Sequence, residues 1–216
     1  MITVEVLLDA SRQPAKNQGN RPTCLAFAIS ELNRQFAPED LGPEFFYRAA
    51  IAQIPGWQPG DGLRIAAAEH ASTLGHPTER EFPYQVEEPT LPLDELPTHL
   101  ELYGGAVEFI NPDIGTLIAS MQAQVPMGLA LRLTVDFYQP QQGVIAFSHA
   151  VLPGAMVHAV AAVGLGYDSH GEPWFLIRNS WGATWGLEGH AWVSSTYIAA
   201  HAACAFGVEH GSSNSG

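Results

Sequence analysis

Positively charged residues are scarce in this sequence. Lys and Arg together number 9 against 22 Asp and Glu, so the net charge is −13, and Lys16 is the single lysine. Nucleic acids and anionic membrane surfaces bind proteins through clustered positive charge. We therefore expect neither nucleic acid nor membrane among the partners of this chain. The surplus carboxylates predict a solvated acidic surface, with an acidic cleft for cationic substrates as the alternative.

Cysteines and targeting segments are also few. Cys24 and Cys204 are the only two cysteines, which is too few for a disulfide framework and favours a reducing compartment. The N-terminal stretch "MITVEVLLDASRQ" carries acidic residues where a secretory signal has basic ones. No apolar run reaches the roughly 20 residues that span a membrane, and no Asn-X-Ser/Thr site occurs. These absences predict a soluble, cytoplasmic protein.

Several motifs of other enzyme classes are missing. There is no G-x-S-x-G, so a serine hydrolase has no support. "VGLGYD" (163–168) lacks the third glycine of a dinucleotide-binding loop, and a turn follows it instead of a helix. His70 and His76 have no partners at metal-ligand spacing, so we read them as a helix face and a loop. We expect no metal and no cofactor.

Helical patterns dominate the first half of the chain. Pro22 and Thr23 are well placed at a helix start, and Asn111 or Asp113 is a candidate cap for a later helix. Between them, residues 76–104 are rich in Pro, Glu and Thr and predict an extended loop. The predicted helices cover residues 22–36, 42–54, 61–75 and 111–124.

Strand patterns dominate the second half. The predicted strands cover residues 127–135, 157–168, 172–181, 189–198 and 204–210, with "YDSHGEPW" as a hairpin turn. A flexible tail is expected at 211–216. This order predicts an α+β fold in which one domain, 1–216, has two lobes with a cleft between them. The helical lobe spans about 10–105, and the β lobe spans about 106–210 together with an N-terminal strand, 1–9.

Cys24 follows a polar turn, "NQGNRPT", and begins an apolar, helix-favouring run. A helix start is where a thiolate forms most easily, although a lone cysteine is more often a buried structural residue. A cysteine nucleophile also needs two partners, namely a base and a group that orients the base. Cys204 lies in an apolar strand and has no such candidate partners in its motif, so it is predicted to be a core or rim thiol.

Two histidines are candidates for the base. His149 lies in a loop, whereas His158 begins a long apolar strand, where a titratable residue is out of place unless it has a partner. We therefore favour His158. Asn179, at the end of another apolar strand, can orient the imidazole, and Gln18, six residues before Cys24, can join the Cys24 N–H in an oxyanion hole.

These residues resemble the papain family of cysteine peptidases. The family's motifs occur in order, as "NQGNRPTCLAFA", "DGLRIAAAEHASTLGHPTEREFPY", "VPMGLALRLTVDFYQPQQGVI", "HAVAAVGLGYD" and "WFLIRNSWGATWG". Cys24 precedes His158 by 134 residues and Asn179 by 155, against roughly 130–150 in the family. The low-pKa, histidine-paired cysteine of papain is a standard example of this chemistry.

The resemblance implies a papain-like two-lobe fold, with a helical N-terminal lobe and an antiparallel β-barrel-like C-terminal lobe. It also implies roles for individual residues: Gln18 as oxyanion donor, Cys24 as nucleophile, His158 as acid and base, Asn179 as its orienter, and Trp181 as a cover over their hydrogen bond. Gly62 and Leu63 match positions that bind the substrate backbone and form a pocket wall. Ala130 and Ala159 match the main specificity pocket, which would be open and apolar and favour an aliphatic or aromatic side chain.

The sequence departs from the family in several places. Arg21-Pro22-Thr23 stand where the family usually has Cys-Gly-Ser, Leu25 follows the nucleophile where the family has Trp, and Asp61-Gly62 replaces Gly-Gly. The cysteine missing at position 21 normally forms a disulfide. The family's inhibitory propeptide is absent from this chain, which predicts a disulfide-free, bacterial-style member without one, or else a trimmed chain.

The resulting functional hypothesis is cysteine-dependent hydrolysis of peptide bonds through a thiolate–imidazolium pair and an acyl-enzyme. Two alternatives remain open: a transpeptidase or amidase that uses the same acyl-enzyme, and a catalytically weak pseudoenzyme that binds peptides. The expected partners are a peptide or protein substrate and a regulatory protein, since an unguarded peptidase in a cell needs either control or narrow specificity.

Overall fold

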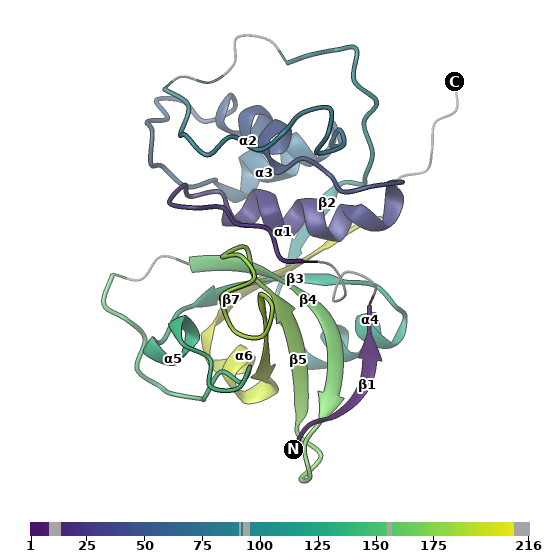
Figure 1. The fold of residues 1–216 in the computed structure, drawn as a ribbon, viewed down its shortest axis with the longest axis vertical. Helices are drawn as coiled ribbons and strands as arrows, with labels where there is room; N and C mark the ends of the chain where they lie inside the picture. The colour runs from purple at the N-terminus through teal and green to yellow at the C-terminus, as the bar shows by residue number, and fades with distance from the viewer. Residues whose placement is uncertain (9–13, 91, 93–95, 155–156, 210–216) are drawn as a thin grey trace. The chain divides into compact units, whose positions relative to one another are not determined.

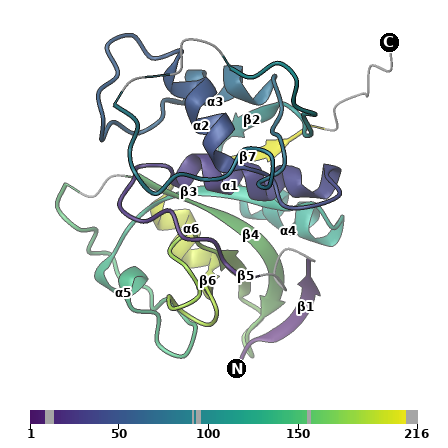
Figure 2. The ribbon, with the colours of Figure 1, turned by 45° about the horizontal axis from the view of Figure 1, so that its top comes forward.

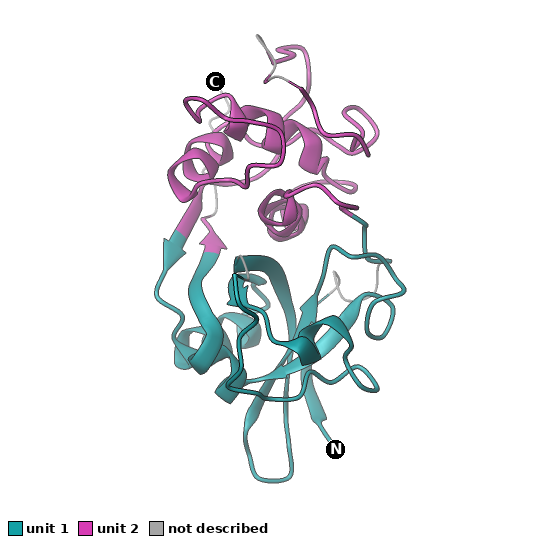
Figure 3. Ribbon diagram, turned by 90° about the vertical axis from the view of Figure 1, so that its left-hand side faces the viewer, with its two compact units in different colours: residues 1–17, 109–206 teal, residues 18–108, 207–216 magenta. Residues whose placement is uncertain are grey.

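A computed structural model describes residues 1–8, 14–90, 92, 96–154 and 157–209. The chain divides into two compact units (Figure 3). Unit 1 contains Met1–Asn17 and Phe109–Phe206, and unit 2 contains Gln18–Glu108 and Gly207–Gly216. The expected tail, 211–216, lies outside the described residues.

Unit 2 contains the first group of helices (Figure 1). These are α1 (Cys24–Asn33) with a short 3₁₀ turn, η2 (Arg34–Phe36), then α2 (Pro43–Ile51) and α3 (Ile65–Ser72). Each of the first three predicted helices is confirmed, with shorter bounds. Helix α2 packs against both α1 and α3, and all nine of its residues are buried, including Glu44 and Arg48.

The start of α1 differs from the expectation. The helix begins at Cys24, so Pro22 lies before the cap position and not in the first turn. Thr23 is the N-cap residue, but its side chain makes no capping hydrogen bond. Its hydroxyl instead bonds to the Tyr84 hydroxyl, at 2.9 Å. A contact with a residue far along the chain has therefore replaced the local cap.

The other end of α1 is held by a buried polar network. Asn33 Oδ1 accepts from Gly105 N at 2.8 Å, so its Nδ2 is the donor to His76 Nε2 at 3.3 Å. His76 then donates from Nδ1 to Ser30 Oγ, at 3.0 Å. Burial lowers the pKa of His76 to about 3, so this histidine is neutral. It belongs to the core of unit 2, although the segment around it, 76–104, has no helix or strand among its described residues, as predicted.

Unit 1 is built on a twisted sheet (Figures 1 and 2). The strands are β1 (Thr3–Leu7), β2 (Val107–Ile110), β3 (Met127–Arg132), β4 (Val157–Tyr167), β5 (Pro173–Arg178), β6 (His190–Ser194) and β7 (Ala202–Val208). Their order is β2-β7-β3-β4-β5-β6, and β1 pairs with β4. Because the order ends at β2 and β6, the sheet is open, which corrects the barrel-like expectation. The boundary between the units falls within β2 and β7.

Strand β4 is the centre of this sheet. It pairs antiparallel with β3 through residues 157–162 and with β1 through residues 164–167. Strand β5 pairs along the other edge, from Ala161 to Tyr167. The β4–β5 hairpin closes at the predicted turn, where Asp168 Oδ1 accepts from the N–H groups of His170 and Glu172.

Three helices accompany the sheet: α4 (Ile114–Gln122), α5 (Val135–Tyr138) and α6 (Ser195–His201). Helices α4 and α6 pack against each other and against β3. Asp113 caps α4 by accepting from Thr116 N at 2.7 Å, which decides between the two expected caps. None of the helices in the described part of the chain is both long and apolar enough for a membrane span.

Three of the strand predictions were wrong or incomplete. The strand expected at 189–198 ends at Ser194, whose hydroxyl accepts from Tyr197 N at 3.1 Å and starts α6. The strand expected at 127–135 ends at Arg132, and α5 begins at Val135. Strand β2 was not predicted, because four residues are too few for a periodic pattern to be distinctive.

Candidate active site

The pairing of β4 with β5 brings His158 and Asn179 together in unit 1. His158 is the second residue of β4, and Asn179 directly follows β5. Ala161 and Arg178 are antiparallel partners, so the beginning of β4 lies beside the end of β5. The two side chains meet at 2.7 Å, between His158 Nε2 and Asn179 Oδ1. Both residues are buried, with exposed fractions of 7% and 3%.

The hydrogen bonds around Asn179 determine which imidazole nitrogen carries the proton. Ser180 N donates to Asn179 Oδ1 at 2.8 Å, and only the oxygen of the amide can accept from an N–H group. The atom that faces His158 is therefore an acceptor, and His158 Nε2 must carry a hydrogen. In the neutral imidazole the other nitrogen, Nδ1, then has the lone pair that a general base needs.

Burial determines the charge of His158. Removal from water lowers the pKa of His158 to about 4, and the bond to Asn179 opposes this shift. The imidazole is therefore neutral at pH 7 unless an anion is placed beside it. The expected thiolate–imidazolium pair therefore requires a nearby anion to stabilise the charged imidazole.

Aromatic rings surround the His158–Asn179 pair. The Trp181 ring lies 4.7 Å from the His158 ring, and the Phe137 ring lies 5.9 Å away in an edge-on arrangement. Tyr138 stacks on Trp181 at 5.2 Å, and Trp185 Nε1 donates to Phe137 O at 2.9 Å. The Trp181 ring thus lies close to the imidazole, and its role as a cover over the His158–Asn179 hydrogen bond stays a prediction. Sequence reasoning missed Phe137, although the aromatic pair in "VDFYQP", just after a strand, was an available signal.

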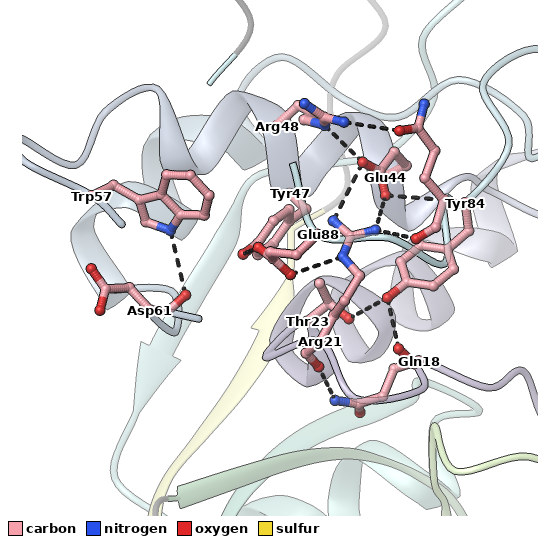
Figure 4. A network of polar contacts seen from close by, with 11 residues as sticks. Gln18, Arg21, Thr23, Glu44, Tyr47, Arg48, Trp57, Asp61, Tyr84 and Glu88 are labelled. Atoms are coloured by element: carbon pink, nitrogen blue, oxygen red, sulfur yellow. Dashed lines mark hydrogen bonds and ion pairs between the residues drawn. The ribbon is translucent and has the colours of Figure 1, made fainter. Parts of the chain in front are cut away.

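Unit 2 carries the predicted nucleophile and oxyanion donor. Cys24 is the first residue of α1 and is partly exposed. Gln18 is 7% exposed, and its Nε2 donates to Arg21 O at 2.7 Å (Figure 4). Gly19 takes φ +62°, a value that suits glycine and lets the chain reverse direction after Gln18. The side-chain amide of Gln18 is therefore oriented by its own loop.

The predicted substrate-binding residues occur in both units. Gly62 and Leu63 lie in the irregular segment before α3 and are partly exposed. The carboxylate of Asp61 accepts from Gln58 N at 2.9 Å and closes a turn. In unit 1, Ala130 and Ala159 are direct partners across β3 and β4, with exposed fractions of 8% and 4%. Side chains alternate between the two faces of a strand, so Ala159 points away from the face that carries His158.

The remaining candidates have ordinary surroundings. His149 is exposed in a loop, with its ring 4.7 Å from that of Phe147. Cys204 lies in β7 opposite Ala130, and burial raises the pKa of its thiol. No disulfide joins Cys204 to Cys24. Among the described residues, no cluster of three or more His, Cys, Asp or Glu side chains could hold a metal ion.

Comparison with known proteins points to one family of cysteine proteases. The family model described as "Papain family cysteine protease" matches residues 60–209. This range includes His158 and Asn179 and begins after Gln18 and Cys24. Cysteine proteinase 2 of Zea mays is 41% identical over 205 residues, covering 84% of this chain and 52% of that protein. The cathepsin L-like proteinase of Fasciola hepatica is 25% identical over 186 residues, covering 81% and 54%.

Solved structures share the fold at lower sequence identity. The bromelain protease of Ananas comosus, solved in complex with the E64 inhibitor, aligns with a TM-score of 0.68 at 20% identity, covering 95% of this chain and 99% of that chain. Digestive procathepsin L 3 of Tenebrio molitor aligns with a TM-score of 0.75 at 17% identity, covering 96% and 70%. The matched region spans about half of these two curated relatives, and a quarter of the cathepsin B-like CP2 of Giardia intestinalis. These relatives are not bacterial, so the bacterial type stays a prediction.

Proposed function

Because the chain belongs to the papain family of cysteine proteases, we propose that it hydrolyses peptide bonds with Cys24 as the nucleophile and His158 as the acid and base. The observation that carries the proposal is the fixed tautomer of His158. Asn179 accepts the Nε2 proton at 2.7 Å, which reserves Nδ1 for proton transfer. A buried imidazole with one nitrogen engaged and the other available as a base is what a thiol nucleophile requires.

The reaction balances with the side chains of both units. His158 Nδ1 takes the thiol proton of Cys24, and the sulfur attacks the carbonyl carbon of the scissile peptide. The oxyanion receives hydrogen bonds from Cys24 N–H and from Gln18 Nε2, which carries a second hydrogen besides the one donated to Arg21 O. His158 then protonates the leaving amine. Water, deprotonated by the same nitrogen, cleaves the thioester and returns the thiol.

Electrostatics support a thiolate at this position. The N-terminal turn of α1 carries partial positive charge, which lowers the pKa of a cysteine thiol. A thiolate would in turn stabilise the imidazolium of His158, whose pKa is otherwise lowered by burial to about 4. We therefore propose that the two groups charge together, and that neither is charged when the other is removed.

The substrate is proposed to be an extended peptide with an aliphatic or aromatic side chain near the scissile bond. Ala130 and Ala159 are small and apolar, and Gly62 with Leu63 supplies backbone groups in an irregular segment. The two units are proposed to act as one peptidase domain. A reducing, cytoplasmic location and a regulatory protein partner are proposed on the strength of the two thiols outside any disulfide and the need to control proteolysis.

Alkylation of the thiols tests this proposal directly. Wild type, Cys24→Ala, His158→Ala and the matched control Cys204→Ala are treated with iodoacetamide at pH 6 and followed by intact mass. We expect rapid single-site labelling of wild type and Cys204→Ala, none in Cys24→Ala, and slow labelling in His158→Ala. A peptide library then identifies the cleaved bonds and the product ends.

Each other outcome has a defined meaning. Slow labelling that is indifferent to His158 would refute the activated pair and leave a peptide-binding pseudoenzyme. Products joined to an added amine, in place of hydrolysed ends, would assign a transpeptidase or amidase. Broad degradation of casein by the purified protein would contradict narrow specificity.

A further inference from the structure

The hydroxyl of Tyr84 ties together the two ends of the loop that precedes Cys24. It donates to Gln18 O at 2.8 Å, because a carbonyl can only accept. With its single hydrogen used there, Tyr84 Oη accepts from Thr23 Oγ1, at 2.9 Å. Burial raises the pKa of the Tyr84 phenol, so it is protonated at neutral pH. Tyr84 therefore fixes both Gln18 and the residue next to Cys24 (Figure 4).

Arg21, in the middle of the same loop, is held on several sides. Its guanidinium is 3% exposed and forms ion pairs with Glu44 and, at 3.0 Å, with Glu88. It also donates to Gln85 O. The rings of Tyr47 and Tyr84 lie 4.9 Å and 4.7 Å from the guanidinium carbon. Arg21 thereby joins the loop to helix α2 and to the segment around residue 85.

The carboxylates around Arg21 are themselves engaged. Glu44 has no exposed surface and accepts from Arg48 Nε at 2.7 Å. Tyr47 donates its hydroxyl to Glu88, and Tyr84 N donates to Glu79 at 2.8 Å. Arg21, Arg48, Glu44 and Glu88 together carry equal numbers of positive and negative charges. These four charges therefore balance, with Arg21 and Glu44 buried and Glu88 partly exposed, and the network consists mainly of groups from segments far apart in the sequence.

A buried ion network of this kind fixes geometry more reliably than it adds stability. Taking charges out of water offsets much of their mutual attraction, so a buried pair is weak evidence for stability. Its directional hydrogen bonds nevertheless permit only one arrangement of the groups that make them. The geometry held here is that of the loop from Gln18 to Thr23. In the papain family, the position that matches Arg21 is usually a cysteine that forms a disulfide.

We propose that Tyr84 and Arg21 are positioning residues of this peptidase, which hold the Gln18–Thr23 loop so that Gln18 Nε2 and Cys24 N–H converge on the oxyanion. The inference rests on the proposed function. Gln18 Nε2 itself bonds to Arg21 O, at 2.7 Å, so displacement of Arg21 moves the oxyanion donor directly. Thr23 precedes Cys24, so release of its hydroxyl from Tyr84 loosens the second donor.

Tyr84→Phe is the sharpest variant, because it removes one hydroxyl and keeps the ring that faces Arg21. The matched control is Tyr197→Phe, which removes a buried hydroxyl from unit 1, where Tyr197 bonds to Thr134 at 3.4 Å. We expect kcat to fall about tenfold in Tyr84→Phe with KM within about twofold, which is less than the roughly 10²–10³-fold loss when an oxyanion donor is removed outright. Tyr197→Phe should keep the wild-type kcat.

A second readout separates positioning from folding. Alkylation of Cys24 by iodoacetamide displaces iodide and forms no oxyanion, so its rate at pH 6 should stay within about twofold in Tyr84→Phe. Hydrogen exchange should show faster exchange of the Thr23 amide, which donates to Arg21 O at 2.9 Å. Asn33→Ala, which disrupts the network at the other end of α1, should lower thermal stability while leaving kcat per folded molecule unchanged.

Separate variants test the positioning role of Arg21. Arg21→Lys should not restore the wild-type kcat, because one ammonium cannot replace the planar fork that reaches Glu44, Glu88 and Gln85 O. The control Arg80→Gln removes an exposed arginine that pairs with Glu39, 78% and 43% exposed, and should have no effect. Thr23→Val with Tyr84→Phe completes a double-mutant cycle in which the double variant should be no worse than Tyr84→Phe alone.

The results distinguish the failure of this inference from the failure of the proposed function. Wild-type kcat and Thr23 exchange in Tyr84→Phe would overturn the positioning role while leaving the peptidase assignment intact. Equal losses in hydrolysis and alkylation would overturn it in favour of a folding role. If wild type cleaves no peptide, the proposed function fails, and the exchange rates still decide whether Tyr84 holds the loop. Should Tyr84→Phe not fold, Thr23→Val removes one of its two hydrogen bonds, the one between Thr23 Oγ1 and Tyr84 Oη, and keeps the bond to Gln18 O.

Discussion

Replacing Asn179 with alanine removes the acceptor that fixes the His158 tautomer. His158 is 7% exposed, so its Nε2–H would lose its hydrogen bond to Asn179 in a site that water enters poorly. An unsatisfied buried donor costs about 1–3 kcal/mol. The imidazole would then also populate the tautomer with the proton on Nδ1, which is inactive as a base at that nitrogen.

The magnitude follows from that energy. Since about 1.4 kcal/mol corresponds to a tenfold change in rate, we expect kcat/KM to fall about tenfold to a hundredfold in Asn179→Ala. The His158 pKa should also fall further below its value of about 4, because the Asn179 bond raises it. The control Asn179→Asp keeps an acceptor for both Ser180 N and His158, and its negative charge should raise the His158 pKa.

Two measurements check this reasoning. Peptide hydrolysis gives kcat/KM across pH, and nitrogen chemical shifts of His158 report which nitrogen carries the proton. The shifts are best recorded in the Cys24→Ala background, where no Cys24 thiolate is present and the pKa of His158 should stay near 4. The reasoning would be refuted by an Asn179→Ala enzyme with wild-type kcat/KM and with the proton still on Nε2.

Two further predictions concern stability. In the Cys24→Ala variant, where no thiolate can hold His158 as an imidazolium, the pKa values of His76 and His158, about 3 and about 4, lie below the unfolded value of about 6.5. The stability that these neutral histidines contribute to this variant is therefore full above pH 6.5 and is lost as the pH falls. Protonation of each histidine should lower the free energy of unfolding by up to about 1.4 kcal/mol per pH unit in that window. Urea unfolding at pH 7 and pH 5 measures this difference, and equal stabilities at the two pH values would contradict it. Gly128→Ala would place a Cβ 2.0 Å from the Phe206 ring. We expect the free energy of unfolding to fall by about 1–3 kcal/mol, which thermal unfolding measures. An unchanged midpoint would contradict this and would mean that β7 shifts freely.

The sequence was informative wherever one residue type has a strong local preference. Apolar runs with helix-favouring residues predicted α1, α2 and α3, and Asp and Gly predicted the β4–β5 turn. The prediction failed at Ser194, where the alternating pattern of β6 ends at a serine that caps the helix "STYIAAH". Ser, Thr and Asn serve both in strands and at helix starts, so the boundary was settled by the hydroxyl bond to Tyr197 and not by the pattern.

The chemical identity of the candidate site was readable in the same way. A cysteine at a helix start, a histidine in an apolar strand and an asparagine after another strand are each unusual, and their order along the chain marked them together. What the sequence determined by itself is therefore the residue types of the site and the elements that carry them, because both depend on local preference and motif order.

Tertiary structure alone decided how those residues are oriented and held. The tautomer of His158 depends on the antiparallel register of β4 and β5, and the conformation of the loop before Cys24 depends on Tyr84 and on a buried Glu44. Tyr84 lies 66 residues from Gln18, and Glu44 lies 23 residues from Arg21. Hydrogen bonds and ion pairs across such separations form only after the chain has folded, so no local pattern encodes them.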